Sequence, residues 1–301
     1  MNKANFFIVG APKCGTTALS EYLRSHPAIF MSTPKEPNYF CFDLPGLQYI
    51  SKPKDYERLF SSSTATQSML GEASPSYLFS HQAMAEIHKY NPDAQIIVML
   101  RNPTEMLPSY HSQLVYSAYE DQADFCKAWK LQSERLRGNH IPKACREPMA
   151  LQYSEVATFA DQLERVFAIF QKEKVLILFF DDFKKDPKKT YEDVLGFLHL
   201  PSDSRTEFPI VNPNKIARSE RFNNLLHNPP KWALSIMSRL SGSALHDFLI
   251  KLHSILKNAN TEQASRAPLD PEFLAEITNA FYSQVLRVEQ LTGRNLDSWK
   301  Q

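Results

Sequence analysis

The chain has 301 residues, 43% of them hydrophobic and 22% charged, which is the composition of a globular protein with one large α/β domain or two small ones. The net charge of +1, from 34 basic and 33 acidic side chains, gives no electrostatic argument for a nucleic-acid or membrane partner. The four cysteines form no C-x-x-C pair, so neither a zinc site nor a disulfide framework is indicated. No run reaches the length of a signal-peptide core or a membrane span, which predicts a cytoplasmic protein.

Taken in chain order, short apolar runs and helical patterns alternate along the first two thirds of the sequence. Strands are predicted at residues 6–9, 28–31, 69–71, 96–100 and 175–180. Helices are predicted at residues 17–25, 81–90, 153–171 and 191–198. This alternation predicts an α/β protein with a P-loop-like, doubly wound and mainly parallel sheet that has helices on both faces.

The last third of the chain has a different pattern, which is helical throughout. Apolar stripes run through residues 245–255 and 273–291, and a polar loop is predicted at 258–268 between them. We therefore expect a single domain over residues 1–301. Within it, residues 228–268 would be a helical insertion or lid, and residues 269–301 a C-terminal helix that packs back on the core.

The first strand runs directly into a glycine-containing loop, Gly10-Ala11-Pro12-Lys13-Cys14-Gly15-Thr16-Thr17, that opens a helix. Backbone N–H groups and the helix N-terminus in such a loop present hydrogen-bond donors and a positive dipole to an anion. In a nucleoside-triphosphate loop a lysine precedes the final hydroxyl residue. Here Thr16 occupies that position and the lysine has moved forward to Lys13. The loop is therefore predicted to bind a phosphate-bearing nucleotide without a metal bridge.

A second candidate anion site follows the strand at 96–100. That strand ends at Arg101, where a magnesium-binding aspartate would be expected in a nucleoside-triphosphatase. Ser109 comes eight residues later, near the start of the next helix. A guanidinium and a hydroxyl can converge on one phosphate at the carboxyl end of a central strand. The alternative interpretation is an arginine that only forms a salt bridge at the strand end.

Together these two segments resemble the PAPS-dependent sulfotransferase family, where PAPS is 3′-phosphoadenosine 5′-phosphosulfate. The first is similar to its 5′-phosphosulfate loop and the second to its 3′-phosphate motif. Residues 32–40 look like the K-E-P-x-F-F segment of the carbohydrate-type and bacterial branches, and residues 71–78 like their G-E-x-S-P-x-Y segment. Residues 179–200 and 291–299 are also typical. The resemblance covers about residues 5–225 and 270–300.

The resemblance implies PAPS as co-substrate, with no metal, and assigns roles to residues of both motifs. Lys13 would neutralise the leaving phosphate oxygen as a catalytic residue. The 5′-phosphate would be held by Lys13, Cys14, Gly15, Thr16 and Thr17. Arg101 and Ser109 would hold the 3′-phosphate, and Lys215 and Arg218 are further candidates for nucleotide contact.

The catalytic base is implied less directly. The resemblance puts a catalytic glutamate at Glu36, beside Lys35, which could tune that carboxylate or touch the donor sulfate. Glu72 lies in a segment that points toward the same pocket in the family, with positioning as its expected role. His111 is the alternative base, and Lys35, Glu72 and His111 are our candidate acceptor-side residues. His26, at a helix end before Pro27, is expected to be structural.

The acceptor implied by the K-E-P segment is an alcohol on a sugar or another natural product. Two other functions stay open at this point. A P-loop kinase for a small metabolite would need magnesium and ATP, which the displaced lysine and Arg101 disfavour. A non-catalytic nucleotide-binding module would keep the fold without turnover.

Overall fold

The computed structural model describes the whole chain except residues 1–2, 210, 212–214, 218–254, 257–258 and 264–267. The chain divides into two compact units. The first unit comprises Met1–Leu107, Gln152–Val211 and Asp270–Gln301, and the second unit comprises Pro108–Leu151 and Asn212–Leu269. Among the described helices, none is both long enough and apolar enough to cross a membrane.

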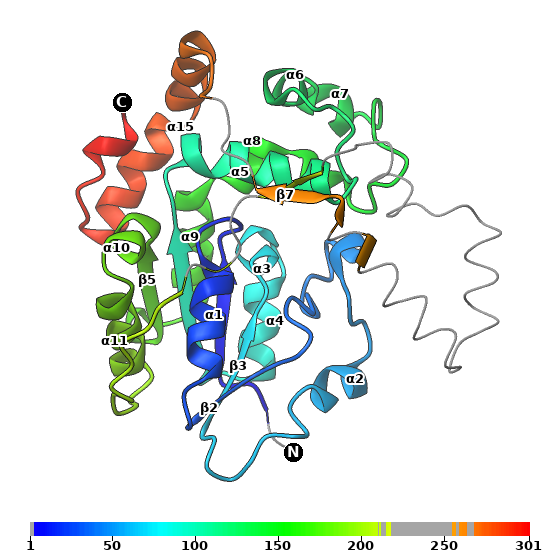
Figure 1. Cartoon of the computed structure of the whole chain (residues 1–301). Coiled ribbons are helices and arrows are strands. Elements are labelled where there is room, and N and C mark those ends of the chain that lie inside the picture. The colour runs from blue at the N-terminus through cyan, green and yellow to red at the C-terminus, as the bar shows by residue number, and fades with distance from the viewer. Residues whose placement is uncertain (1–2, 210, 212–214, 218–254, 257–258, 264–267) are drawn as a thin grey trace, which may run out of the picture. The chain divides into compact units, whose positions relative to one another are not determined.

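The first unit is built on a parallel sheet of five strands in the order β2-β3-β1-β4-β5 (Figure 1). The strands are β1 (Phe6–Gly10), β2 (Ile29–Met31), β3 (Met69–Ala73), β4 (Gln95–Leu100) and β5 (Val175–Phe179). Strands β2 and β3 lie on one side of β1 in the sheet, and β4 and β5, which come later in the chain, lie on its other side. The strand order therefore reverses between β1 and β4, which is where open α/β sheets bind their ligands. The predicted doubly wound parallel sheet is confirmed.

Close packing explains why the central strands carry the residues they do. The side chains of Phe6, Phe7, Ile8 and Val9 are all fully buried. Phe6 pairs in register with Gly71 of β3, and a Cβ atom on Gly71 would lie 2.0 Å from Cζ of Phe6. The aromatic ring thus occupies the space that the glycine leaves, and a larger residue at position 71 would push β1 and β3 apart.

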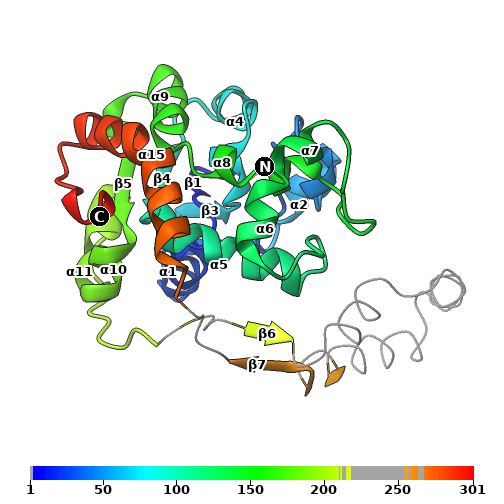
Figure 2. The same ribbon diagram turned by 90° about the horizontal axis from the view of Figure 1, so that it is seen from above.

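Helices cover both faces of this sheet, as predicted (Figure 2). On one face α1 (Thr16–Arg24) contacts α11 (Pro187–Phe197). On the other face α3 (Ser76–Phe79), α4 (Ala83–Tyr90) and α9 (Phe159–Ile169) contact one another. The predicted C-terminal helix is α15 (Pro271–Thr292), which packs against α9. The first unit also contains α2 (Pro53–Arg58), α8 (Tyr153–Val156) and α10 (Phe180–Lys185).

The single helix predicted over residues 153–171 is interrupted and forms α8 and α9 instead. Thr158 lies outside the helical conformation at the start of α9. The side-chain amide of Gln162 donates to the carbonyl oxygens of Glu155 and Val156, both at 3.1 Å. These carbonyls lie at the end of α8, where the helical hydrogen-bond pattern stops, and the hydroxyl of Thr158 also donates to the carbonyl of Glu155 at 2.9 Å. The apolar stripe continues across the break, which is why its period alone did not reveal the interruption.

The second unit contains α6 (Phe125–Lys130), α7 (Gln132–Leu136) and most of α5 (Pro103–Tyr116), which begins in the first unit. It also contains an antiparallel ladder of β6 (Lys215–Ala217) and β7 (Thr261–Gln263). The sequence pattern places β7 in a polar loop, because three polar residues carry no alternating pattern and their partner strand is distant in sequence. The stripe at 245–255, except for Ile255, and most of the insertion at 228–268 lie outside the described residues.

Candidate functional site

The glycine-containing loop leaves the carboxyl end of β1 and starts α1 at Thr16. Gly15 is the N-cap residue of α1, with a φ of 92°, and it has no side chain that could cap the helix. Amides in the first turn of a helix lack partners within that helix, so those of Thr16 and Thr17 are directed toward the loop. Lys13 also has a positive φ, 63°. This is the local geometry of an anion-binding loop at a helix N-terminus.

Arg101 follows β4, the neighbour of β1, and is held against the same loop. The amide of Ala11 donates to the carbonyl of Met99 at 2.6 Å, which ties the loop to β4. One guanidinium nitrogen of Arg101, Nη1, donates to the carbonyl of Lys13 at 3.4 Å. The structure therefore places the loop of residues 10–17 and Arg101 side by side at the point where the strand order reverses.

The remaining donors of Arg101 face a carboxylate. Its Nε and Nη2 atoms donate to Oε2 of Glu105 at 3.1 and 2.8 Å. Glu105 lies one helical turn further along, in α5, and its side chain is 54% exposed against 18% for Arg101. A phosphate bound by Arg101 would thus have to share the guanidinium with Glu105 or displace its carboxylate.

Phe180 forms a wall of this loop that the sequence pattern did not reveal. Its ring lies 4.5 Å from the guanidinium carbon of Arg101. A Cβ atom added to Gly15 would lie 3.1 Å from the rings of Phe180 and Phe183. The apolar run at 175–180 predicts Phe180 as the last residue of a strand, but it is the first residue of α10. The sequence feature that could have predicted the start of α10 is Phe-Phe-Asp-Asp, because acidic residues after an apolar run are typical of a helix start.

Cys14 points into the protein. Its thiol donates to the carbonyl of Pro12 at 3.4 Å and is completely buried. Burial raises the pKa of the Cys14 thiol to about 12, although the positive charges of Arg101 and Lys13 act in the opposite direction. Any contact of Cys14 with a bound nucleotide has to use its backbone amide.

Lys35 and Glu36 follow β2 and form an ion pair with each other. The Glu36 side chain is 43% exposed, whereas that of Lys35 is 17% exposed. The amide of Glu36 donates to the carbonyl of Ala73 at 3.1 Å, at the end of β3. Because β3 is the parallel neighbour of β1, this ion pair and the loop of residues 10–17 both lie at the carboxyl ends of the strands.

Glu72, in contrast, has no exposed surface at all. Its carboxylate accepts hydrogen bonds from the hydroxyls of Tyr56 at 2.6 Å, Ser74 at 2.5 Å and Tyr77 at 3.1 Å. Burial raises the pKa of the Glu72 carboxyl to about 7, while these hydrogen bonds and the charge of Lys35 lower it. Direct contact between Glu72 and an acceptor stays a prediction, and this geometry favours an indirect role.

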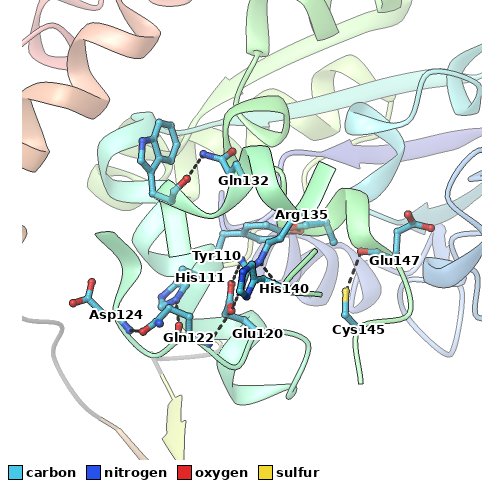
Figure 3. A network of polar contacts seen from close by, with 12 residues as sticks. Tyr110, His111, Glu120, Gln122, Asp124, Gln132, Arg135, His140, Cys145 and Glu147 are labelled. Carbon is cyan, nitrogen blue, oxygen red and sulfur yellow. Dashed lines mark hydrogen bonds and ion pairs between the residues drawn. The ribbon is translucent and has the colours of Figure 1, made fainter. Parts of the chain in front are cut away.

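The other predicted residues lie in the second unit or are structural. Ser109 and His111 are buried in α5. His111 Nε2 lies 2.8 Å from the carbonyl oxygen of Gln122, within a polar network shown in Figure 3. Burial lowers the pKa of the His111 imidazole, opposed in part by its contact with Gln122. The roles of both residues stay predictions.

Two further nucleotide-binding candidates and one histidine complete the set. Lys215 is the first residue of β6, and Arg218 lies outside the described residues. His26 accepts a hydrogen bond from the amide of Ala28 on Nδ1 at 3.1 Å, while its Nε2 lies 3.1 Å from the carbonyl of Pro201. His26 therefore stabilises the turn after α1, as expected for a structural residue.

The fold and this loop define a class of protein: α/β proteins that present a glycine-containing loop and a helix N-terminus at the reversal point of a parallel sheet. Comparison with known families is more specific. The family model described as "Sulfotransferase domain" matches residues 3–248. The chain belongs to the sulfotransferase family.

Individual relatives agree with this family. Carbohydrate sulfotransferase 15 of Homo sapiens is 28% identical over 286 residues, covering 77% of this chain and 50% of that protein. Heparan sulfate glucosamine 3-O-sulfotransferase 6 of Mus musculus is 36% identical over 108 residues, covering 35% of this chain and 29% of that protein. The chain thus spans about half the length of the first of these relatives. The solved structure of a sulfotransferase from Alicyclobacillus acidocaldarius superposes with a TM-score of 0.73 and 26% identity, covering 100% of both chains.

Proposed function

We propose that the chain is an enzyme that transfers the sulfuryl group of PAPS to an alcohol, on a sugar or another natural product, and releases adenosine 3′,5′-bisphosphate. The observation that carries this proposal is the convergence of the Lys13 loop and Arg101 at the reversal point of the sheet. Two cations and a helix N-terminus suit a ligand with two separate phosphate groups. Family membership supplies the sulfuryl chemistry.

In the proposed reaction the acceptor oxygen attacks sulfur in line with the leaving group. A new bond forms between that oxygen and sulfur, and the bond between sulfur and the bridging phosphate oxygen breaks. Negative charge builds on the leaving phosphate, where Lys13 and the amides of Thr16 and Thr17 would stabilise it. The acceptor proton passes to Glu36, which must first loosen its ion pair with Lys35. Lys35 is then placed to meet the transferring sulfate.

Arg101, together with Ser109, would bind the 3′-phosphate that distinguishes PAPS from simpler adenine nucleotides. The carboxylate of Glu105 would compete with that phosphate for the guanidinium. Lys215 and Arg218 are proposed as further contacts for the bound nucleotide.

The direct test is turnover with sulfur-35-labelled PAPS against pools of sugars, glycans and other alcohols. Label is expected to move to at least one pool, and adenosine 3′,5′-bisphosphate is expected to bind in calorimetry without magnesium. Binding of the bisphosphate without transfer to any acceptor would favour the non-catalytic module. Binding that required magnesium and ATP, with indifference to PAPS, would favour the kinase.

A further inference from the structure

The segment that carries Glu36 is hydrogen-bonded at alternate residues to the end of β3 and to α3, which follows it. The amide of Glu36 donates to the carbonyl of Ala73 at 3.1 Å. Two residues later the amide of Asn38 donates to the hydroxyl of Ser74, also at 3.1 Å. After two more residues the amide of Phe40 donates to the hydroxyl of Tyr77 at 3.4 Å. Two of these three acceptors are thus side-chain hydroxyls rather than backbone carbonyls.

The same two hydroxyls donate to Glu72 from the other side. A hydroxyl has one proton and two lone pairs. The hydroxyls of Ser74 and Tyr77 donate hydrogen bonds to the buried Glu72 carboxylate, at 2.5 and 3.1 Å. Their lone pairs are therefore left to accept from the amides of the segment above. Removal of the negative charge beneath them would free both hydroxyls to rotate and donate elsewhere.

The backbone of this segment needs such support. Glu36 and Asn38 have positive φ angles of 61° and 48°, in the left-handed region that costs free energy for residues other than glycine. Such conformations persist where the surroundings hold them in place. The ring of Tyr39 also stacks on Tyr56, with centroids 4.5 Å apart, and Tyr56 is the third hydroxyl donor to Glu72.

We propose that Glu72, acting through the hydroxyls of Ser74 and Tyr77, is a positioning residue that holds the Lys35–Glu36 pair in place for sulfuryl transfer. The inference rests on the proposed function for the role of Glu36, but the hydrogen bonds themselves do not. The carboxylate of Glu72 does not touch the acceptor. It fixes the orientation of the two hydroxyls by accepting their hydrogen bonds, and the hydroxyls in turn accept hydrogen bonds from the backbone amides of the segment.

Two matched variants separate this role from a general loss of packing. Ser74→Ala and Tyr56→Phe each remove one hydroxyl donor from Glu72, but only Ser74→Ala also removes an acceptor from the segment. We expect Ser74→Ala to lower kcat about tenfold or more. Its affinity for adenosine 3′,5′-bisphosphate should stay within about twofold of the wild type, because the phosphate loop is untouched. Tyr56→Phe should keep kcat within about twofold.

A second measurement does not depend on activity. Amide hydrogen exchange over residues 36–40 should accelerate in Ser74→Ala and in Glu72→Gln, and stay unchanged in Tyr56→Phe. Equal losses of kcat in Ser74→Ala and Tyr56→Phe, or unchanged exchange at the amide of Asn38 in Ser74→Ala, would overturn the inference. A wild-type protein that transfers no sulfuryl group would instead refute the proposed function, while the exchange data would still decide whether Glu72 holds the segment.

Discussion

Lys13 has a left-handed backbone conformation, and its carbonyl oxygen accepts a hydrogen bond from the guanidinium of Arg101, so its backbone is held beside Arg101. Its ammonium charge is the one that we assign to the leaving phosphate. The variant Lys13→Ala removes that charge from the leaving phosphate. We expect kcat to fall by about two to three orders of magnitude, as when another preorganised donor to a developing anion is removed. The exposed Lys188 offers the control Lys188→Ala, which should turn over normally. Normal turnover in Lys13→Ala, measured with labelled PAPS, would remove Lys13 from the mechanism.

Glu36 and His111 are the two candidate bases, and their surroundings differ. Glu36 is partly exposed beside Lys35, whereas His111 is buried and bonded to a carbonyl. We expect Glu36→Gln to lower kcat by about two orders of magnitude or more, with bisphosphate affinity nearly intact. His111→Gln should keep most of the activity. The reverse pattern in steady-state kinetics would assign the base to His111.

Glu72 should make stability depend on pH. Its pKa is about 7 in the folded protein, against an ordinary value of 4.5, so the folded state holds this proton more tightly than the unfolded chain. The contribution to stability is greatest below pH 4.5, declines as pH rises to about 7, and is constant above that. When the pH rises from 5 to 8, the free energy of unfolding of the wild type should fall by about 2 kcal/mol more than that of Glu72→Gln. Urea unfolding at both values tests this, and parallel losses would contradict it.

At the scale of elements, the start of α1 depends on Gly15. Its φ is 92°, and a Cβ atom at this position would lie 3.1 Å from two aromatic rings, which would have to shift to accommodate a side chain. We expect Gly15→Ala to cost about 1–3 kcal/mol of stability and to weaken bisphosphate binding. Gly293, after α15, has a φ of 69° and open space around it. Gly293→Ala should therefore lose stability but keep its affinity in calorimetry. Equal losses of affinity would show that the loop does not bind the nucleotide.

The strands of the first unit and its longer helices could be predicted from sequence to within a few residues, because their signals are local, whereas the short helices α2, α3 and α10 were not predicted. Continuous apolar runs mark strands that are buried on both faces, and β4 begins one residue from its predicted start. The break between α8 and α9 could not be predicted, since it depends on Gln162 reaching back to two carbonyls. Strand β7 was missed for a similar reason, because three polar residues become a strand only through pairing with β6.

At the scale of the whole molecule, the second unit contains a fully buried charge pair (Figure 3). Arg135 donates to Glu120 through Nη1 and Nη2, both at 2.6 Å, and neither side chain is exposed. Arg135 also donates to the carbonyl of His140 at 3.2 Å. A buried pair of this kind adds little compared with apolar residues, but removal of one partner leaves an uncompensated charge.

We therefore expect Arg135→Met to destabilise the second unit by about 3–5 kcal/mol. The neighbouring Arg137 pairs with Glu134 at the surface, with 68% of the arginine side chain exposed. Arg137→Met should cost at most about 1 kcal/mol. Hydrogen exchange over residues 109–137 provides the measurement, with faster exchange expected only in the first variant. Equal exchange in both variants would show that Arg135 is not critical.

The sheet, its winding and the two candidate anion-binding motifs could all be predicted from the sequence, because each depends on local patterns and on spacing along the chain. The position of Lys13 differs from that of the lysine in a nucleoside-triphosphate loop, and Arg101 stands where a magnesium-binding aspartate would be expected. Both differences are visible in the sequence. Only the tertiary structure decided that Arg101 contacts the loop through the carbonyl of Lys13 and that Phe180 forms its wall. It also decided that Glu72 is buried beneath the Glu36 segment. These relations join residues that are distant in sequence, and packing rather than local pattern brings them together.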